Sequence, residues 1–174
     1  MAVDYFLKIN GINGESLQVN HKQEMEMLSW SFGETMKATP AAGTQGGVEK
    51  VKLGEFNFTK RLDISSPQLH SQNSAGALIQ WARFTARRAG ETGGQPVDYL
   101  FVTFGQVVIT NYEVHGRGED GWPSENISFS YKTIVMTYRQ MINGVAQGPV
   151  VGGYDASQNI LASQVAGAPA LPAL

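Results

Sequence analysis

The chain has 174 residues, of which 42% are hydrophobic and 16% are charged, and its formal net charge is −2. This length suits one domain, and the near-neutral charge gives no general basis for binding nucleic acid or acidic lipid. The absence of cysteine excludes disulfides and thiolate metal sites. The first residues lack the features of a signal peptide, and no apolar run approaches the about 20 residues that span a bilayer. We therefore expect a protein that folds in the cytoplasm and does not insert into membranes.

The first third of the chain predicts two strands and a long loop. Val3–Ile9 has a strand pattern that stops at an Asn-Gly turn. His21–Phe32 has a second strand pattern, whose apolar face changes near Leu28, which suggests a kink or a change of environment. Gly33–Lys50 is rich in Gly, Thr, Ala and Pro without periodicity, which predicts a long loop. Loops of this length in a compact domain are usually functional or disordered.

The middle of the chain predicts a strand and then one short helix. Val51–Leu62 has a strand pattern whose phase breaks at Gly54, which suggests a β-bulge. Ser66 can cap a helix, and Pro67 suits its first position because its missing N–H has no partner there. Gly76 is a natural helix stop.

The second half predicts three further strands. Ala77–Arg88 is a moderate strand, and Val97–Tyr112 is a strong one with two apolar faces. We expect a core to cover one of these faces and a helix or another subunit to cover the other. Asn126–Arg139 is the last clear strand, with a phase shift near Lys132. The spacing and the turn signals fit an antiparallel barrel or sandwich.

The end of the chain differs in composition from the rest. Beyond residue 144 it becomes rich in Gly and Ala, and the last stretch is AGAPALPAL. We expect a single domain over residues 1–166 and a disordered tail over residues 167–174.

The stretch RRAGETGGQPVDYLFVTF, residues 87–104, places two arginines beside a glycine-rich loop. A phosphate-binding loop needs a helix after it, whereas a β-branched and aromatic run follows here, so we predict a hairpin. Glu24 and Glu26 share one side of a strand and are expected to be solvated. We expect no catalytic residue, no cofactor and no metal site. The histidines lie far apart without metal-ligand spacing, and we expect them at the surface or in turns: His21, His70 and His115.

The tryptophans leave one alternative function open. Trp30, Trp81 and Trp122 could line a sugar site, although two core residues and one loop residue is the favoured interpretation. The alternative is a carbohydrate- or small-ligand-binding β-barrel, which would show ligand-facing aromatic side chains and a monomeric or dimeric state.

Six stretches in order resemble one known family. They are MAVDYFLKINGINGES, HKQEMEMLSWSFG, FNFTKRLDISSPQL, RRAGETGGQPVDYLFVTF, SENISFSYKTIVMTYR and GPVVGGYDASQN. Together they resemble the Hcp family, the haemolysin-coregulated tube proteins of bacterial type VI secretion. The resemblance covers roughly the first 160 residues of the chain, and its specificity lies in the order of six matches along one sequence.

The resemblance implies a mainly β protein, a small antiparallel β-barrel with one short flanking α-helix and extended loops. It implies a structural subunit, not an enzyme, that forms hexameric rings stacked into a hollow tube. A contractile sheath would surround the tube, a spike protein would sit at its tip, and effector proteins would travel in the lumen. Ejection without a signal peptide agrees with the N-terminal sequence.

Two groups of residues are candidate sites under this resemblance. In the family an extended loop reaches from one ring toward the next, which corresponds here to Gly33–Lys50. Ser29 and Ser31 are the candidates for the lumen, because small hydroxyls suit a wet wall when Trp30 between them turns to the core. The loop residues expected to make the ring-stacking contacts are Met36, Lys37, Thr39, Pro40 and Thr44.

Overall fold

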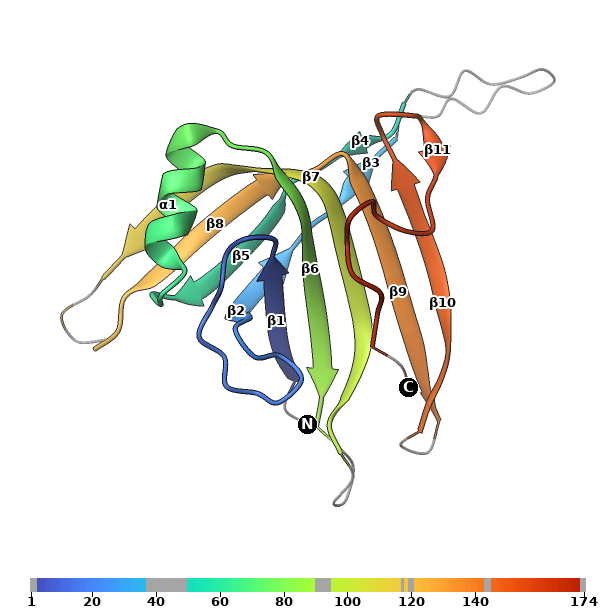
Figure 1. The fold of residues 1–174 in the computed structure, drawn as a ribbon, viewed down its shortest axis with the longest axis horizontal. Coiled ribbons are helices and arrows are strands. Elements are labelled where there is room, and N and C mark those ends of the chain that lie inside the picture. Colours follow the sequence, from blue (N-terminus) through green and yellow to red (C-terminus); the bar gives the residue numbers. More distant parts are fainter. Residues whose placement is uncertain are drawn as a thin grey trace.

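The computed structural model describes residues 3–36, 50–89, 95–116, 118, 121–142 and 145–172. An antiparallel sheet in the order β7-β6-β1-β2-β5-β8 curls into a six-stranded barrel, which closes because β8 also pairs with β7 (Figure 1). The one helix among the described residues, α1 (Ser66–Ala75), lies against β7. The predicted small antiparallel barrel with a flanking helix is confirmed. The barrel strands are β1 (Val3–Ile9), β2 (Met25–Ser31), β5 (Phe56–Arg61), β6 (Ile79–Arg88), β7 (Val97–His115) and β8 (Ser124–Ser130).

Three strands extend the sheet beyond the barrel as a flange, in the order β9, β10 and β11 from β7 outward. The first half of β7 pairs with β6 and β9, and its second half pairs with β8, so the 19-residue strand belongs to both barrel and flange. Its residues from Phe101 to Gly105 are buried on both faces, as the sequence predicted. The chain near Val165, rather than the predicted helix or second subunit, lies over the outer face at Gly105. The flange strands are β9 (Thr133–Ile142), β10 (Val145–Asp155) and β11 (Ile160–Leu161).

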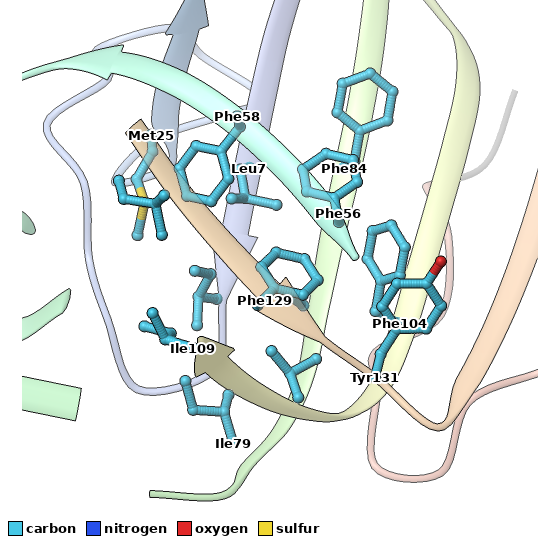
Figure 2. Packing of buried hydrophobic residues seen from close by; sticks show 14 of the residues in the cluster. Leu7, Met25, Phe56, Phe58, Ile79, Phe84, Phe104, Ile109, Phe129 and Tyr131 are labelled. Atoms are coloured by element: carbon cyan, nitrogen blue, oxygen red, sulfur yellow. The ribbon is translucent and has the colours of Figure 1, made fainter. Parts of the chain in front are cut away.

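The barrel interior is filled by aromatic and aliphatic side chains (Figure 2). The ring of Phe56 lies 4.9 Å from that of Phe104 and 5.1 Å from that of Phe129, measured between centroids. These distances are typical of favourable aromatic pairs. Side chains thus fill the interior of this barrel, as they do in other small barrels.

Two of the predicted irregularities in the first half have different outcomes. The kink near Leu28 is confirmed, because the register of β2 against β5 shifts between Met27 and Ser29. The predicted bulge at Gly54 is instead a break between β5 and β4 (Lys52–Leu53), which pairs with β3 (Glu34–Thr35) in a separate sheet. The Gly54 N–H donates to the Gly33 carbonyl at 2.8 Å, and a Cβ there would lie 2.6 Å from that oxygen, so only glycine permits this approach.

The second half contains two departures from the predicted strands. The single strand expected over Asn126–Arg139 is two strands, β8 and β9, which separate at Lys132 and pair with different parts of β7. The Lys132 N–H donates to the Gly105 carbonyl at 3.0 Å and fixes this crossing. Strand β10 was not predicted, because its three glycines and its proline hide the alternation that marks a strand.

Helix α1 ends as predicted but is capped differently at its start. Ser65, not Ser66, is the N-cap residue, and Pro67 lies in the first turn. The Ser66 hydroxyl instead accepts from the Asp63 N–H at 3.0 Å. Gly76 adopts the left-handed conformation, with φ of 57°, that terminates a helix.

The C-terminal segment, residues 162–172, crosses the outer face of β6, β7 and β9 (Figure 1). Val165 is buried against Trp81 and Val135. The guanidinium of Arg83 donates to the carbonyls of Pro169 and Ala170, and that of Arg139 donates to the carbonyl of Pro172. The disordered tail predicted over residues 167–174 stays a prediction, and in this structure these contacts extend as far as residue 172.

Candidate functional site

A polar strip follows the outer face of β2, β5 and β8. Strand register places Ser29 opposite Thr59 and Ser31 opposite Asn57. Across the next pair of strands, Thr59 lies opposite Asn126 and Asn57 opposite Ser128. The Thr59 hydroxyl donates to the Asn126 side-chain oxygen at 2.8 Å, and the Ser128 hydroxyl donates to that of Asn57 at 2.6 Å. The polar strip consists of Ser29, Ser31, Asn57, Thr59, Asn126 and Ser128.

The alternation of the strands separates this strip from the core. Phe56, Phe58, Ile127 and Phe129 are buried between its members, and Trp30 packs against the core. The side chains of the strip are hydroxyls and amides without a formal charge. Such a surface holds water and donates and accepts hydrogen bonds, but it has no group poised for acid–base or nucleophilic chemistry.

The candidate ring-stacking loop is described only at its base. Strands β3 and β4 pair in a short hairpin, with Thr35 opposite Lys52, at the end where β2 finishes and β5 begins. Met36, which follows β3, is 52% exposed. The other candidate loop residues lie outside the described residues: Lys37, Thr39, Pro40 and Thr44.

A cleft of about 560 Å³ lies at the opposite end of β2 and β5. Three apolar side chains on its walls are exposed, and three exposed carboxylates share those walls. Exposed apolar groups gathered in one place mark interaction sites more often than isolated ones do. The three apolar residues are Leu17, Leu28 and Trp122, and the three acidic residues are Asp4, Glu15 and Glu26.

A buried charged cluster joins the loop after β1 to the β6–β7 hairpin. His21 Nδ1 lies 2.9 Å from Glu24 Oε2, and His21 Nε2 lies 3.1 Å from Asp98 Oδ1. Arg87 Nε donates to the same Asp98 oxygen at 2.7 Å. Burial lowers the pKa of His21, but the hydrogen bonds to Asp98 and Glu24 and their charges outweigh it, so the pKa of His21 is raised. His21 lies in a turn, one of the two settings predicted for the histidines, but it is buried there beside Asp98, which is 77 residues away in sequence. The prediction that Glu24 is solvated is wrong, because Glu24 is buried against His21.

A second buried charged cluster fastens α1 to the barrel. Lys60 is fully buried, and its Nζ lies 2.7 Å from both Asp63 Oδ1 and Glu125 Oε1. Glu125 also accepts from the hydroxyls of Ser66 at 3.0 Å and Tyr112 at 2.8 Å. The sequence carries a signal for this cluster, since Lys60 continues the inward alternation of the two phenylalanines before it.

The remaining sequence candidates do not converge on a site. Trp30 packs on the barrel core, Trp81 lies under the C-terminal segment, and Trp122 lines the cleft. His70 and His115 are exposed. Within the described ranges, no group of three or more His, Cys, Asp or Glu side chains could hold a metal ion.

Among the described residues, no helix is both long enough and apolar enough to cross a membrane.

Known proteins share both the sequence pattern and the fold. Residues 6–138 match the family model described as "Type VI secretion system effector, Hcp". Protein hcp1 of Pseudomonas aeruginosa is 34% identical over 164 residues, which cover 93% of this chain and 100% of that protein. The crystal structure of Hcp1 from Salmonella typhimurium has a TM-score of 0.76 at 31% identity, covering 93% of this chain and 100% of that one.

A further solved relative is the type VI secretion system effector from Yersinia pestis, with a TM-score of 0.70 at 31% identity over 87% of this chain and 99% of that one. The family model spans most of this chain, and the identities extend over nearly its whole length. The chain therefore belongs to the Hcp family, the structural and non-enzymatic tube proteins of type VI secretion.

Proposed function

We propose that this chain forms hexameric rings that stack into the inner tube of a type VI secretion system, with the polar strip lining the channel. The main observation that supports this proposal is the polar strip. A channel wall that lets proteins pass must stay hydrated, and exposed apolar patches would bind passing chains. Hydroxyl and amide side chains without charge satisfy both needs and do not select cargo by its charge.

Ser29 and Ser31 become the channel-facing residues of β2 in this arrangement. Both are exposed, and both are continued across β5 by the polar partners Thr59 and Asn57. The competing idea of a ligand-binding barrel gains no support, because the barrel interior is filled and the tryptophans lie apart.

The channel assignment can be tested with single cysteines, because the chain contains none. Ser31→Cys is compared with Gln68→Cys, which lies exposed on α1. In assembled tubes, a maleimide attached to a particle too large for the channel should label Gln68→Cys but not Ser31→Cys. Both variants should be labelled after dissociation. Equal labelling of the two variants in intact tubes would place β2 outside the channel.

The rings themselves are tested by native mass spectrometry at micromolar concentration, where a six-subunit species is expected. A purely monomeric spectrum would contradict the proposed assembly. Within this assembly, residues 1–166 act as one subunit. Its partners are other copies of the chain, the contractile sheath outside, the spike protein at the tip and effector proteins inside. The tube assembles in the cytoplasm and then leaves the cell or enters a target cell.

The loop beyond β3 supplies the contact between rings in this proposal. Exposed Met36 at its base supports the assignment, and Lys37, Thr39, Pro40 and Thr44 complete it. A loop of this length costs little extra closure entropy, about 0.6 kcal/mol per doubling, so the fold tolerates it. Replacing residues 35–46 by a short Gly-Ser linker should leave single rings intact and abolish stacked tubes and secretion. Persistence of tubes and secretion would show that the loop is only a surface feature.

A further inference from the structure

The C-terminal segment, residues 162–172, covers two arginines on the outer face of the sheet (Figure 1). Arg83 belongs to β6 and Arg139 to β9. The segment meets both arginines with neutral groups. The guanidinium of Arg83 donates to the carbonyls of Pro169 and Ala170, and that of Arg139 donates to a carbonyl three residues further along the chain. Two cations are therefore covered by a stretch of chain that offers them only backbone oxygens.

Arg139 is buried without a carboxylate beside it. Its exposed fraction is 7%, and its Nε has no hydrogen-bond partner. Its guanidinium carbon lies 5.0 Å from the centroid of the Phe101 ring. Among the described residues, its one hydrogen-bond acceptor is the carbonyl of Pro172. Buried charges in proteins are ordinarily paired, because removing a charge from water costs far more than removing a neutral group. The surroundings of Arg139 therefore lack an anion.

Arg83 has the same imbalance of charge. Its Nε donates to the Thr103 hydroxyl at 3.2 Å, which is again a neutral acceptor. Its register partner on β1 is Lys8, so a second, exposed cation lies beside it. Burial lowers the pKa of Arg83, and the charge of Glu24 offsets this lowering only in part. Glu24 is itself engaged with His21 at 2.9 Å.

An apolar slot lies beside the two arginines. Val165 is buried there against Trp81 and Val135. A Cβ on Gly105 would lie 2.8 Å from Val165 Cγ1, so the absence of a side chain on Gly105 makes room for this valine. The slot and the two guanidinium groups together accept an extended chain, and we call this surface the arginine face. It consists of Trp81, Arg83, Phe101, Gly105, Val135 and Arg139.

We propose that the arginine face binds an extended peptide segment of a partner protein that carries an apolar anchor and carboxylates, and that this partner segment displaces the C-terminal segment. A hydrogen bond from a guanidinium to a carboxylate is roughly twice as strong as one between neutral groups. The C-terminal segment contains no acidic residue, so it covers the arginines without compensating their charge.

The strand order places this site away from the polar strip. In the closed barrel β7-β6-β1-β2-β5-β8, strand β7 lies across from β2, and β6 lies across from β5. If the polar strip lines the channel, the arginine face is on the outside of the tube. This outward position rests on the proposed function, whereas the chemistry of the site does not depend on it.

Binding of two labelled peptides to the full chain, measured by fluorescence anisotropy, tests the proposal. Both peptides have the sequence of residues 162–172 with two changes near the arginines. The acidic probe carries Ala170→Asp and Pro172→Glu, which brings one carboxylate to each arginine. The neutral probe carries Ala170→Asn and Pro172→Gln, which have similar shapes without the charge. The acidic probe should bind about tenfold more tightly, because its hydrogen bonds are charge-assisted.

Variants of the chain connect this difference to the two arginines. Arg83→Gln with Arg139→Gln should remove the preference for the acidic probe, because glutamine keeps a donor and loses the charge. Lys52→Gln removes an exposed cation from β4 and is the matched control. It should leave the preference for the acidic probe unchanged.

A thiol at the anchor position supplies a second readout. The chain contains no cysteine, so Val165→Cys introduces a single thiol, and its rate of reaction with Ellman's reagent reports release of the C-terminal segment. The acidic probe should speed this reaction more than the neutral probe does. Ala170→Asp in the same chain should slow the reaction, because it brings a carboxylate to Arg83, whereas Ala170→Asn should not.

The outcomes separate this inference from the proposed function. Equal binding of the two probes would show that the arginine face recognises only backbone, as in an exchange of C-terminal segments between copies, and would overturn the proposal. Absence of binding of the acidic probe at millimolar concentration would also overturn it. Either result would leave the rings untouched, because native mass spectrometry reports them separately. A monomeric spectrum together with preferred binding of the acidic probe would contradict the rings and support the site.

Discussion

Removal of the Lys60 ammonium should destabilise the protein more than the loss of any single exposed charge. Lys60→Met keeps an unbranched side chain, shorter by the ammonium nitrogen, and so removes the charge and the three donors. The wild-type Nζ lies 2.7 Å from Asp63 and from Glu125, and it donates to the Arg61 carbonyl at 2.8 Å. After the substitution, the carboxylates of Asp63 and Glu125 are left without the cation that lay between them, and Glu125 is fully buried.

The magnitude follows from that burial. Removing one partner of a buried ion pair typically costs about 3–5 kcal/mol, because the other charge is left uncompensated. For a chain of this size each kcal/mol corresponds to about 2–4 °C in Tm. We therefore expect Lys60→Met to lower Tm by roughly 6–20 °C. Because Ser66 and Asp63 lie at the start of α1, loosening of this helix should accompany the loss.

The assay is thermal unfolding followed by circular dichroism at matched protein concentration. Lys8→Met, at an exposed position of β1, is the control and should change Tm little. The double variant Lys60→Met/Glu125→Gln should lose less stability than the two single variants lose in sum. The second change removes the carboxylate charge that Lys60→Met leaves uncompensated. A fall in Tm no larger than that of Lys8→Met would refute the reasoning.

Three further outcomes follow from buried contacts. Because the pKa of His21 is raised in the folded state, its stabilisation is full below the ordinary value of about 6.5 and is lost as pH rises through the folded pKa. Denaturant unfolding should thus show His21→Gln to be most destabilising in acid, and His115→Gln, at an exposed position, is the matched control. Cutting the chain after Ala166 should lower stability by about 1–2 kcal/mol, because Arg83 and Arg139 lose their hydrogen bonds to the carbonyls beyond the cut. An unchanged Tm would show that the residues after Ala166 do not dock on the sheet. Gly105→Val should lower stability by about 1–3 kcal/mol, because the new side chain overpacks against Val165. In a chain that lacks the whole C-terminal segment, Val165 included, the same substitution should lower stability less.

Local pattern was sufficient for the barrel strands and the helix stop. The alternation in β5 and β8 identified their buried faces, and the phase change at Leu28 identified the bulge in β2. Gly76 marked the end of α1, since glycine has no Cβ and adopts the left-handed conformation at little cost. Each of these features depends on neighbours within a few residues, which is the range that sequence periodicity reports.

The polar strip was half predictable. Ser29 and Ser31 were recognised because they flank an inward Trp30, and the structure places them on the outer face of β2. Asn57 and Ser128 were not recognised, because nothing in the local sequence indicates that β8 pairs with β5. Pairing between segments some 70 residues apart is decided by the closure of the sheet.

By itself, the sequence determined that this chain is a cysteine-free, mainly β protein with one short helix, and its ordered motifs pointed to the Hcp family. Only the tertiary structure decided where the charges are buried and which surfaces lie at opposite ends. His21 has the local appearance of a surface residue, whereas Lys60 shares the inward phase of Phe56 and Phe58. Both are buried because Asp98 and Glu125, from distant strands, lie beside them and compensate their charges. The cleft likewise exists only because the loop after β1, the end of β5 and the start of β8 meet in space. Whether a charged side chain is buried depends on a partner from a distant segment, and only folding brings the two segments together.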